Sequence, residues 1–343
     1  MTTNKYHKPE SWQFAFFDSK SGSRIRYGFT APDGESKGTV VVTGGYNNPI
    51  EYYYEQINNW RDRGYTVYAM DWDGQGGSSR SNASRRDWPA DRDFGEHADM
   101  FHEFVQDIVK PDQTKPAFIS SHSKGGNIML RYMKKYEQRD DYPFTAAILG
   151  APLIDMNTRF IPKKAFRRLI ETFNFLGVRD VPMQDAGKLF FAFKQAMNAQ
   201  PPPSEDDAKR KAAGQDNKHA SEPHNIGLPT IQWLRRALHS INEVKHPDFL
   251  KNIETPILIL TPHKDGLVCV ESQKWAAEQL PHGKQIEFKN ARHGIWYDTD
   301  HIQKQVWREV DHFTNNLTFG HYARSPWLVA INQKLTFSRN NQP

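Results

Sequence analysis

Residues 118–130 decide the fold of this chain, and they read Phe118-Ile119-Ser120-Ser121-His122-Ser123-Lys124-Gly125-Gly126-Asn127-Ile128-Met129-Leu130. An apolar run comes first, small residues follow, and helix-compatible residues continue to Tyr136, so we predict a strand, a sharp turn and a helix. A nucleophile elbow needs this arrangement, with small residues two positions before and after the nucleophile, because strand and helix nearly touch there. Ser121, Ser123 and Gly125 supply that spacing, although glycine is more common than serine at the first position. The alternative is an ordinary loop rich in serine and glycine.

The length and composition indicate one domain with a large insertion. The chain has 343 residues, which is long for one domain and short for two independent ones. Charged residues make up 25% of it, no apolar run is long enough to span a bilayer, and residues 1–10 lack a charged-then-apolar leader. We therefore expect a soluble, cytoplasmic protein, with a peripheral position at the inner membrane surface as the alternative.

The charge and cysteine content limit the partners. The formal net charge of +5 is too diffuse to indicate nucleic-acid binding, and a solvated basic surface explains it more simply than attraction to an anionic membrane. Cys269 is the single cysteine, which excludes an internal disulfide and a cysteine-based metal cluster. We expect no nucleic acid among the partners.

Strands and helices alternate along the first part of the chain. Residues 12–29 suggest a hairpin that leads into the sheet. A buried strand at 38–43, a helix at 53–63 and a strand at 65–70 form a unit that argues for a parallel sheet. The glycine-rich turn at 71–80 lacks the G-x-G-x-x-G spacing and precedes no helix, so we reject a dinucleotide site. Further predicted elements are a helix at 97–109, a strand at 117–120 and a strand at 145–150.

The alternation stops between residues 153 and 247, which we interpret as a helical insertion over the sheet. Apolar helices are predicted at 186–197 and 230–244, and the polar, proline-bearing residues 200–224 predict a surface loop. The alternation resumes with strands at 255–261 and 285–288 and helices at 272–280 and 301–316. The predicted units are thus a core in two parts, 1–152 and 248–317, the insertion 153–247 and a C-terminal tail, 318–343.

Three polar residues, each just after a predicted strand, stand in the order Ser123, Asp265, His293. This is the chain order of the catalytic triad in α/β-hydrolases, and it differs from the orders in two well-known protease folds. The serine would be the nucleophile, the imidazole its base, and the carboxylate would fix the tautomer of the imidazole. Taken singly, Asp265 could be a turn residue and His293 a loop histidine, but their joint placement at strand ends favours a triad.

The oxyanion of a tetrahedral intermediate needs preorganised donors. We expect one of them to be the backbone N–H of Lys124, directly after the nucleophile. The other would be that of Tyr46 or Gly45, in the loop after the first buried strand, with Tyr46 preferred. No H-E-x-x-H or His-x-x-x-His helix occurs, so metal-assisted hydrolysis is disfavoured, and we expect neither a metal nor a cofactor.

Six motifs carry a family resemblance, at residues 44–46, 71–80, 122–126, 151–155, 264–268 and 291–293. Together they resemble the lysophospholipase and monoacylglycerol lipase branch of the α/β-hydrolases, over residues 38–316. The resemblance implies an α/β fold of the α/β-hydrolase type, with a mostly parallel central sheet flanked by helices and a helical cap formed by residues 153–247. Gly44 departs from the family pattern, where histidine is frequent, and Lys124 stands where methionine or another apolar residue is common.

By resemblance, Ser123 matches the nucleophile, Asp265 the acid and His293 the base, while Tyr46 and Lys124 match the oxyanion-hole positions. We therefore expect a serine hydrolase that cleaves carboxylic esters through an acyl-enzyme. The expected substrate is a single-chain acyl lipid, a lysophospholipid or monoacylglycerol, because the aromatic insertion suits an acyl chain.

Three alternatives remain open. A short-chain carboxylesterase keeps the same triad. An aminopeptidase or amidase also keeps it, and needs an acid in the cap, such as Glu171 or Asp180, to hold the substrate amine. The third is a non-catalytic binding scaffold. The basic and aromatic residues 163–168 also predict peripheral membrane contact through the cap.

Overall fold

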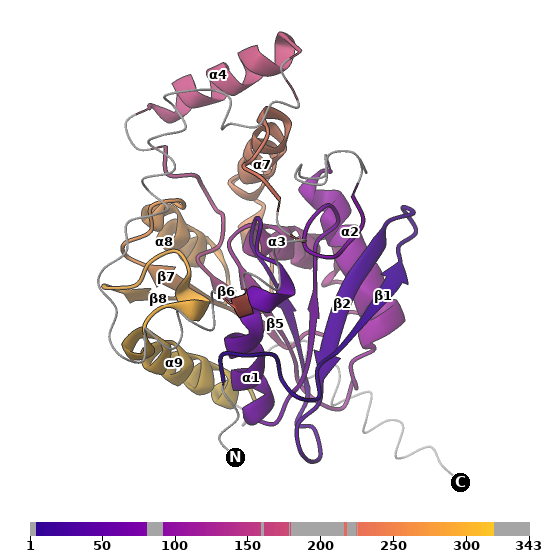
Figure 1. Cartoon of the computed structure of the whole chain (residues 1–343). Coiled ribbons are helices and arrows are strands. Elements are labelled where there is room, and N and C mark those ends of the chain that lie inside the picture. The colour runs from indigo at the N-terminus through magenta and orange to yellow at the C-terminus, as the bar shows by residue number, and fades with distance from the viewer. Residues whose placement is uncertain are drawn as a thin grey trace.

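The computed structural model describes residues 5–80, 92–158, 161–177, 179, 216–217, 224 and 226–318. Within them, eight strands form one sheet in the order β1-β2-β4-β3-β5-β6-β7-β8 (Figure 1). The pairs β1–β2 and β2–β4 are antiparallel and the other neighbours are parallel, so the expected mostly parallel sheet is confirmed. The strands are β1 (Gln13–Asp18), β2 (Arg24–Thr30), β3 (Thr39–Thr43), β4 (Thr66–Met70), β5 (Ala117–His122), β6 (Ala146–Gly150), β7 (Ile257–Pro262) and β8 (Gly283–Phe288).

Helices cover both faces of the sheet. One face packs against α2, α3 and α8 in a first apolar cluster, and the other packs against α1 and α9 in a second. The chain between β6 and β7 contains α4 and α7, which lie at the top of Figure 1. The helices are α1 (Tyr54–Asp62), α2 (Phe94–Phe104), α3 (Lys124–Tyr136), α4 (Lys163–Phe175), α7 (Ile231–Val244), α8 (Val270–Gln279) and α9 (Asp300–Thr318).

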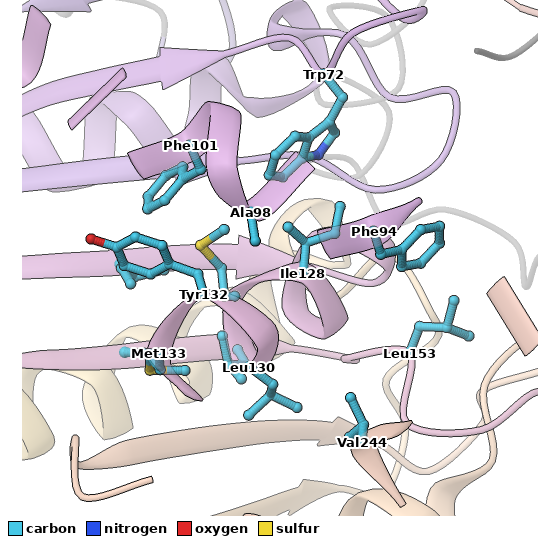
Figure 2. Close-up of a cluster of buried hydrophobic side chains, with 14 of the residues drawn as sticks. Trp72, Phe94, Ala98, Phe101, Ile128, Leu130, Tyr132, Met133, Leu153 and Val244 are labelled. Atoms are coloured by element: carbon cyan, nitrogen blue, oxygen red, sulfur yellow. The ribbon is translucent and has the colours of Figure 1, made fainter. Parts of the chain in front are cut away.

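Apolar strand residues build both clusters. In β3, Val41 joins the cluster under α2 and α3, whereas its neighbour Val40 joins the cluster under α1 and α9. Successive side chains of a strand point to opposite faces, so a strand buried on both faces needs a continuous apolar run. Figure 2 shows part of the first cluster, where Phe101 of α2 and Tyr132 of α3 meet edge to face, with ring centroids 4.8 Å apart.

Most predicted elements are confirmed, with shifted ends. The hairpin expected at 12–29 is formed by β1 and β2, and the helix expected at 230–244 is α7. The helix expected from residue 97 already begins at Phe94, because the Asp93 carboxylate accepts a hydrogen bond from Gly95 N–H (2.7 Å) and caps the helix.

The predicted insertion and tail are described only in part. The helix expected at 186–197 lies outside the described residues, as do nearly all of the loop expected at 200–224 and all of the tail after residue 318. Among the helices that are described, none combines the length and the apolar character that crossing a bilayer requires.

Candidate active site

Ser123 lies on a strained turn between β5 and α3. Its φ of 51° and ψ of −116° fall in a region that residues other than glycine rarely adopt. Two hydrogen bonds hold the turn, one to the end of β6 and one to the segment after it: Ser123 N–H donates to Gly150 O (3.0 Å), and Leu153 N–H donates to Ser123 O (2.9 Å). The neighbouring strand thus fixes the conformation that presents the Ser123 hydroxyl at the end of β5.

Small residues let the helix approach the strand at this turn. A methyl group at Gly125 would lie 2.6 Å from Ser121 Oγ and 2.7 Å from Gly44 O, so a larger residue would force the turn apart. Ser121, at the position where glycine is more common, is accommodated because its hydroxyl is hydrogen-bonded to that of Thr43 (2.7 Å). The local geometry is that of a nucleophile elbow.

The structure brings together Ser123, His293 and Asp265. Ser123 Oγ lies 2.9 Å from His293 Nε2, and His293 Nδ1 lies 2.8 Å from Asp265 Oδ2. The other carboxylate oxygen, Oδ1, accepts the backbone N–H groups of Leu267 (2.8 Å) and Val268 (2.9 Å). Both oxygens of Asp265 are therefore engaged, and its orientation toward the imidazole is fixed. An imidazole held in this way can accept a proton from the serine at Nε2.

His122 lies beside His293 and is fully buried. Its Nε2–H donates to the His293 carbonyl (2.9 Å), and its Nδ1 lies 2.9 Å from the Tyr53 hydroxyl. Because that hydroxyl accepts the N–H of Gly45 (3.0 Å), its own proton is free to reach His122 Nδ1. Burial is the larger cause that lowers the pKa of His122 to about 3, and the charge of the nearby His293 is the smaller one. His122 thus stays neutral and holds the backbone of His293.

The loop after β3 and the start of α3 both adjoin Ser123. A Cβ added at Gly45 would lie 3.1 Å from Ser123 Cβ, which places the loop after β3 against the nucleophile. The N–H of Gly45 is occupied by Tyr53, whereas that of Tyr46 has no hydrogen-bond partner among the described residues. Lys124 begins α3, and the first N–H groups of a helix lack partners within the helix. This arrangement favours Tyr46 over Gly45 as the second donor.

The competing acids of the sequence are engaged elsewhere. Asp71 Oδ2 accepts Arg26 Nε (2.6 Å), and Asp73 is paired with Arg92. Both carboxylates are buried in these ion pairs, so neither is placed to orient His293.

Sequence reasoning missed the side chains that hold the loop after β3. Trp72 Nε1 donates to Gly44 O (2.8 Å), and Gln75 Nε2 donates to Gly45 O (3.0 Å). With Tyr53 on the N–H of Gly45, three side chains hold this short loop. In the sequence, these side chains could have been found from the motif at 71–80, which contains Trp72 and Gln75 and whose composition is too specific for an ordinary turn.

Comparisons with known proteins show a family, two relatives and a fold that this chain resembles. The model of the family described as Hydrolase_4, serine aminopeptidase, S33, matches residues 34–300. A probable lysophospholipase L2 of Haemophilus influenzae is 24% identical over 283 residues, which are 80% of this chain and 83% of the relative. A monoacylglycerol lipase of Mycolicibacterium smegmatis is 27% identical over 146 residues, 43% of this chain and 49% of the relative. A carboxyl esterase of Bacillus coagulans has a similar fold, with a TM-score of 0.68 at 18% identity, over 90% of this chain and 99% of that one.

Proposed function

The chain belongs to the Hydrolase_4 family, which is described as serine aminopeptidase, S33, and we propose that it is a serine ester hydrolase with Ser123 as nucleophile, His293 as base and Asp265 as acid. The observation that carries the proposal is the unbroken chain of hydrogen bonds from Ser123 Oγ through His293 to Asp265, next to a strained elbow. A serine hydroxyl is a weak nucleophile unless an adjacent base removes its proton, and this chain supplies one.

The reaction proceeds in two halves. As Ser123 Oγ attacks the ester carbonyl carbon, its proton passes to His293 Nε2, and the carbonyl oxygen becomes an oxyanion held by the N–H groups of Tyr46 and Lys124. His293 then donates the proton to the leaving alcohol oxygen, the ester bond breaks, and an acyl-Ser123 ester remains. A water molecule then attacks the acyl carbon as it gives a proton to His293. The bond to Ser123 Oγ breaks, His293 returns the proton to this oxygen, and the carboxylic acid leaves.

The substrate class of the proposal is a single-chain acyl lipid. The relatives named probable lysophospholipase L2 and monoacylglycerol lipase support it. So does the contact between Tyr46 and Trp233, whose ring centroids lie 4.5 Å apart, because it places an aromatic side chain of α7 beside the expected oxyanion loop. We propose that the described part of residues 153–247, which contains α4 and α7, belongs to a cap over the site. An acyl chain needs such a largely apolar wall.

Replacing the nucleophile tests the catalytic assignment. Ser123→Ala should abolish hydrolysis of p-nitrophenyl esters and covalent labelling by a fluorophosphonate, because among the described residues no other hydroxyl is paired with His293. The matched control is Ser121→Ala, two residues earlier, which removes a hydroxyl that is hydrogen-bonded to Thr43 and should keep the labelling. Undiminished labelling of Ser123→Ala would refute the assignment.

An amide substrate is the second candidate, because the family description names an aminopeptidase. Such an enzyme needs a free carboxylate to hold the substrate amine. Glu171 on α4 is paired with Arg235 on α7 (3.1 Å), and Asp180 lies outside the described residues. A side-by-side assay of lysophosphatidylcholine and amino-acid arylamides separates the two candidates, and we expect the ester to be the better substrate.

Peripheral contact with an anionic membrane, on the cytoplasmic side, is part of the proposal. On α4, Lys164 and Arg168 are exposed, the last residue, Phe175, is 87% exposed, and Leu176 just after the helix is 64% exposed. Exposed apolar groups beside cations suit the interface of an anionic bilayer. Sedimentation with liposomes should show stronger binding when anionic lipid is included, and equal binding at both compositions would contradict an electrostatic mode.

A further inference from the structure

Two buried side chains form a bridge from the nucleophile elbow to the loop after β3. Lys124 Nζ donates to Gln75 Oε1 (2.9 Å), and Gln75 Nε2 donates to Gly45 O (3.0 Å). Lys124 is 2% exposed and Gln75 is 3% exposed. Only this orientation of the Gln75 amide satisfies both neighbours, since an ammonium group needs an acceptor and a carbonyl needs a donor.

The bridge ends on the peptide group that carries the Tyr46 N–H. In a trans peptide the carbonyl of Gly45 and the N–H of Tyr46 lie in one plane and point in opposite directions. A donor that fixes the Gly45 carbonyl therefore also fixes the direction of the Tyr46 N–H. A hydrogen bond to a carbonyl polarises the peptide as well, which makes its N–H a stronger donor.

Burying the Lys124 side chain at this position is energetically unfavourable. Its amine is not in an ion pair with any described residue, and burial lowers its pKa to about 7, against the opposing effect of the Asp73 charge. Among the described residues, the other charged or titratable groups near it are Arg92, which is paired with Asp73, and His97 on α2. Burial lowers the pKa of His97, and the charges of Lys124 and Arg92 lower it further. An apolar side chain would avoid this desolvation cost, so packing alone does not explain the amine.

We propose that Gln75 and Lys124 are positioning residues that aim and polarise the Gly45–Tyr46 peptide toward the oxyanion. Lys124 then serves both donors of the oxyanion hole: its backbone N–H binds the oxyanion directly, and its side chain orients the second donor through Gln75. The inference rests on the proposed function, because it assigns a role within the same reaction.

The test measures stabilisation of the tetrahedral state separately from substrate binding. For Gln75→Ala and Lys124→Met, we would determine kcat and KM with a p-nitrophenyl ester and the inhibition constant of an alkyl boronic acid, which forms a tetrahedral adduct with the serine. Loss of a whole oxyanion donor lowers kcat by about 100-fold to 1,000-fold, so a misaimed donor should lower it by about 10-fold. The boronic acid should weaken by a similar factor, while KM changes by less than about 2-fold.

A control of the same chemistry excludes general loosening. Gln285→Ala removes a partly buried amide that donates to Thr261 (3.0 Å) on β7, and should leave all three constants unchanged. Unchanged kcat and boronic acid affinity in both bridge variants would overturn the inference, as would an equal fall in the control. If Gln75→Ala does not fold, Lys124→Met alone decides. Fluorophosphonate labelling of the unsubstituted chain keeps the two proposals apart, because its absence would remove the proposed function itself.

Discussion

At the scale of single residues, the orientation of Asp265 decides which nitrogen of His293 carries the proton. Asp265→Asn should lower kcat by about 1,000-fold to 10,000-fold with little change in KM. The N–H groups of Leu267 and Val268 hold the oxygen of the new side chain, so its NH₂ group would face His293 Nδ1. The imidazole would then carry its proton on Nε2 and could not accept one from the serine.

Steady-state kinetics of Asp265→Asn at neutral pH check this prediction. Glu287→Gln is the control, because it makes the same acid-to-amide change beside an exposed histidine, His263, and should leave kcat unaltered. An Asp265→Asn variant with more than about a tenth of the original kcat would contradict the assigned role.

Lys124 also predicts a pH-dependent cost in stability. Burial lowers its pKa to about 7 in the folded chain, from an ordinary value of 10.5, so between these values the unfolded chain binds more protons. The folded state therefore gains stability as the pH rises from 7 toward 10.5, and it carries an unfavourable buried charge below 7. Lys124→Met should raise the melting temperature more at pH 7 than at pH 9.5, measured by calorimetry. An equal change at both pH values would show that the amine is not desolvated.

At the scale of elements, Asp155 joins the start of α4 to the chain just after α7, within the predicted insertion. Its Oδ2 accepts Lys163 Nζ (2.7 Å) at the start of α4 and Lys245 Nζ (2.6 Å) just after α7. Burial alone would raise the pKa of Asp155, but the hydrogen bonds from Lys163 and Lys245 hold it below its ordinary value. The stabilisation is thus complete at neutral pH and is lost in acid, as the pH falls through this lowered pKa.

Asp155→Asn should loosen α4 and lower stability by about 1 to 2 kcal/mol, because both lysines are partly exposed and screened by water. Hydrogen exchange should rise in α4 while that of the central strands stays slow. Asp141→Asn, at an exposed pair with Arg139, is the control and should change neither quantity. Unaltered exchange in α4 of Asp155→Asn would mean that the two ion pairs contribute nothing to its position.

The sequence predicts some elements well and others poorly, for physical reasons. Runs such as residues 38–43 and 255–261 are readable because a strand buried on both faces must be apolar throughout. The position of β4 between β2 and β3 is not readable, because strand order depends on pairing between distant segments. Likewise, Ser123 and His293 could be placed at strand ends from local patterns, whereas the contact between Lys124 and Gln75 arises only when two turns meet in space.

At the scale of the whole molecule, a buried ionic network joins the antiparallel edge of the sheet to the loops of the site. Arg26 on β2 donates through Nε to Asp71 Oδ2 (2.6 Å) and through Nη1 and Nη2 to the two oxygens of Glu51 (2.8 Å each). Asp71 also accepts the N–H of Ile50 (3.0 Å) and that of Gly77 (2.8 Å). One guanidinium thus connects the N-terminal hairpin, the start of the segment leading to α1 and the turn that carries Gln75.

Removing this guanidinium should destabilise the whole fold rather than one loop. Arg26→Met leaves the carboxylates of Glu51 and Asp71 buried without a cation, and breaking a buried pair in this way costs about 3 to 5 kcal/mol. Burial already raises the pKa of Asp71 despite Arg26, so without the cation this acid should take up a proton more readily. Since a raised folded-state pKa gives stability that is lost as the pH rises, the deficit in the urea midpoint should be larger at pH 8 than at pH 5.

Arg24→Met, on the same strand with its side chain in solvent, should cost less than about 1 kcal/mol at either pH. Equal midpoints for Arg26→Met and Arg24→Met would show that the network does not hold the sheet edge to the site.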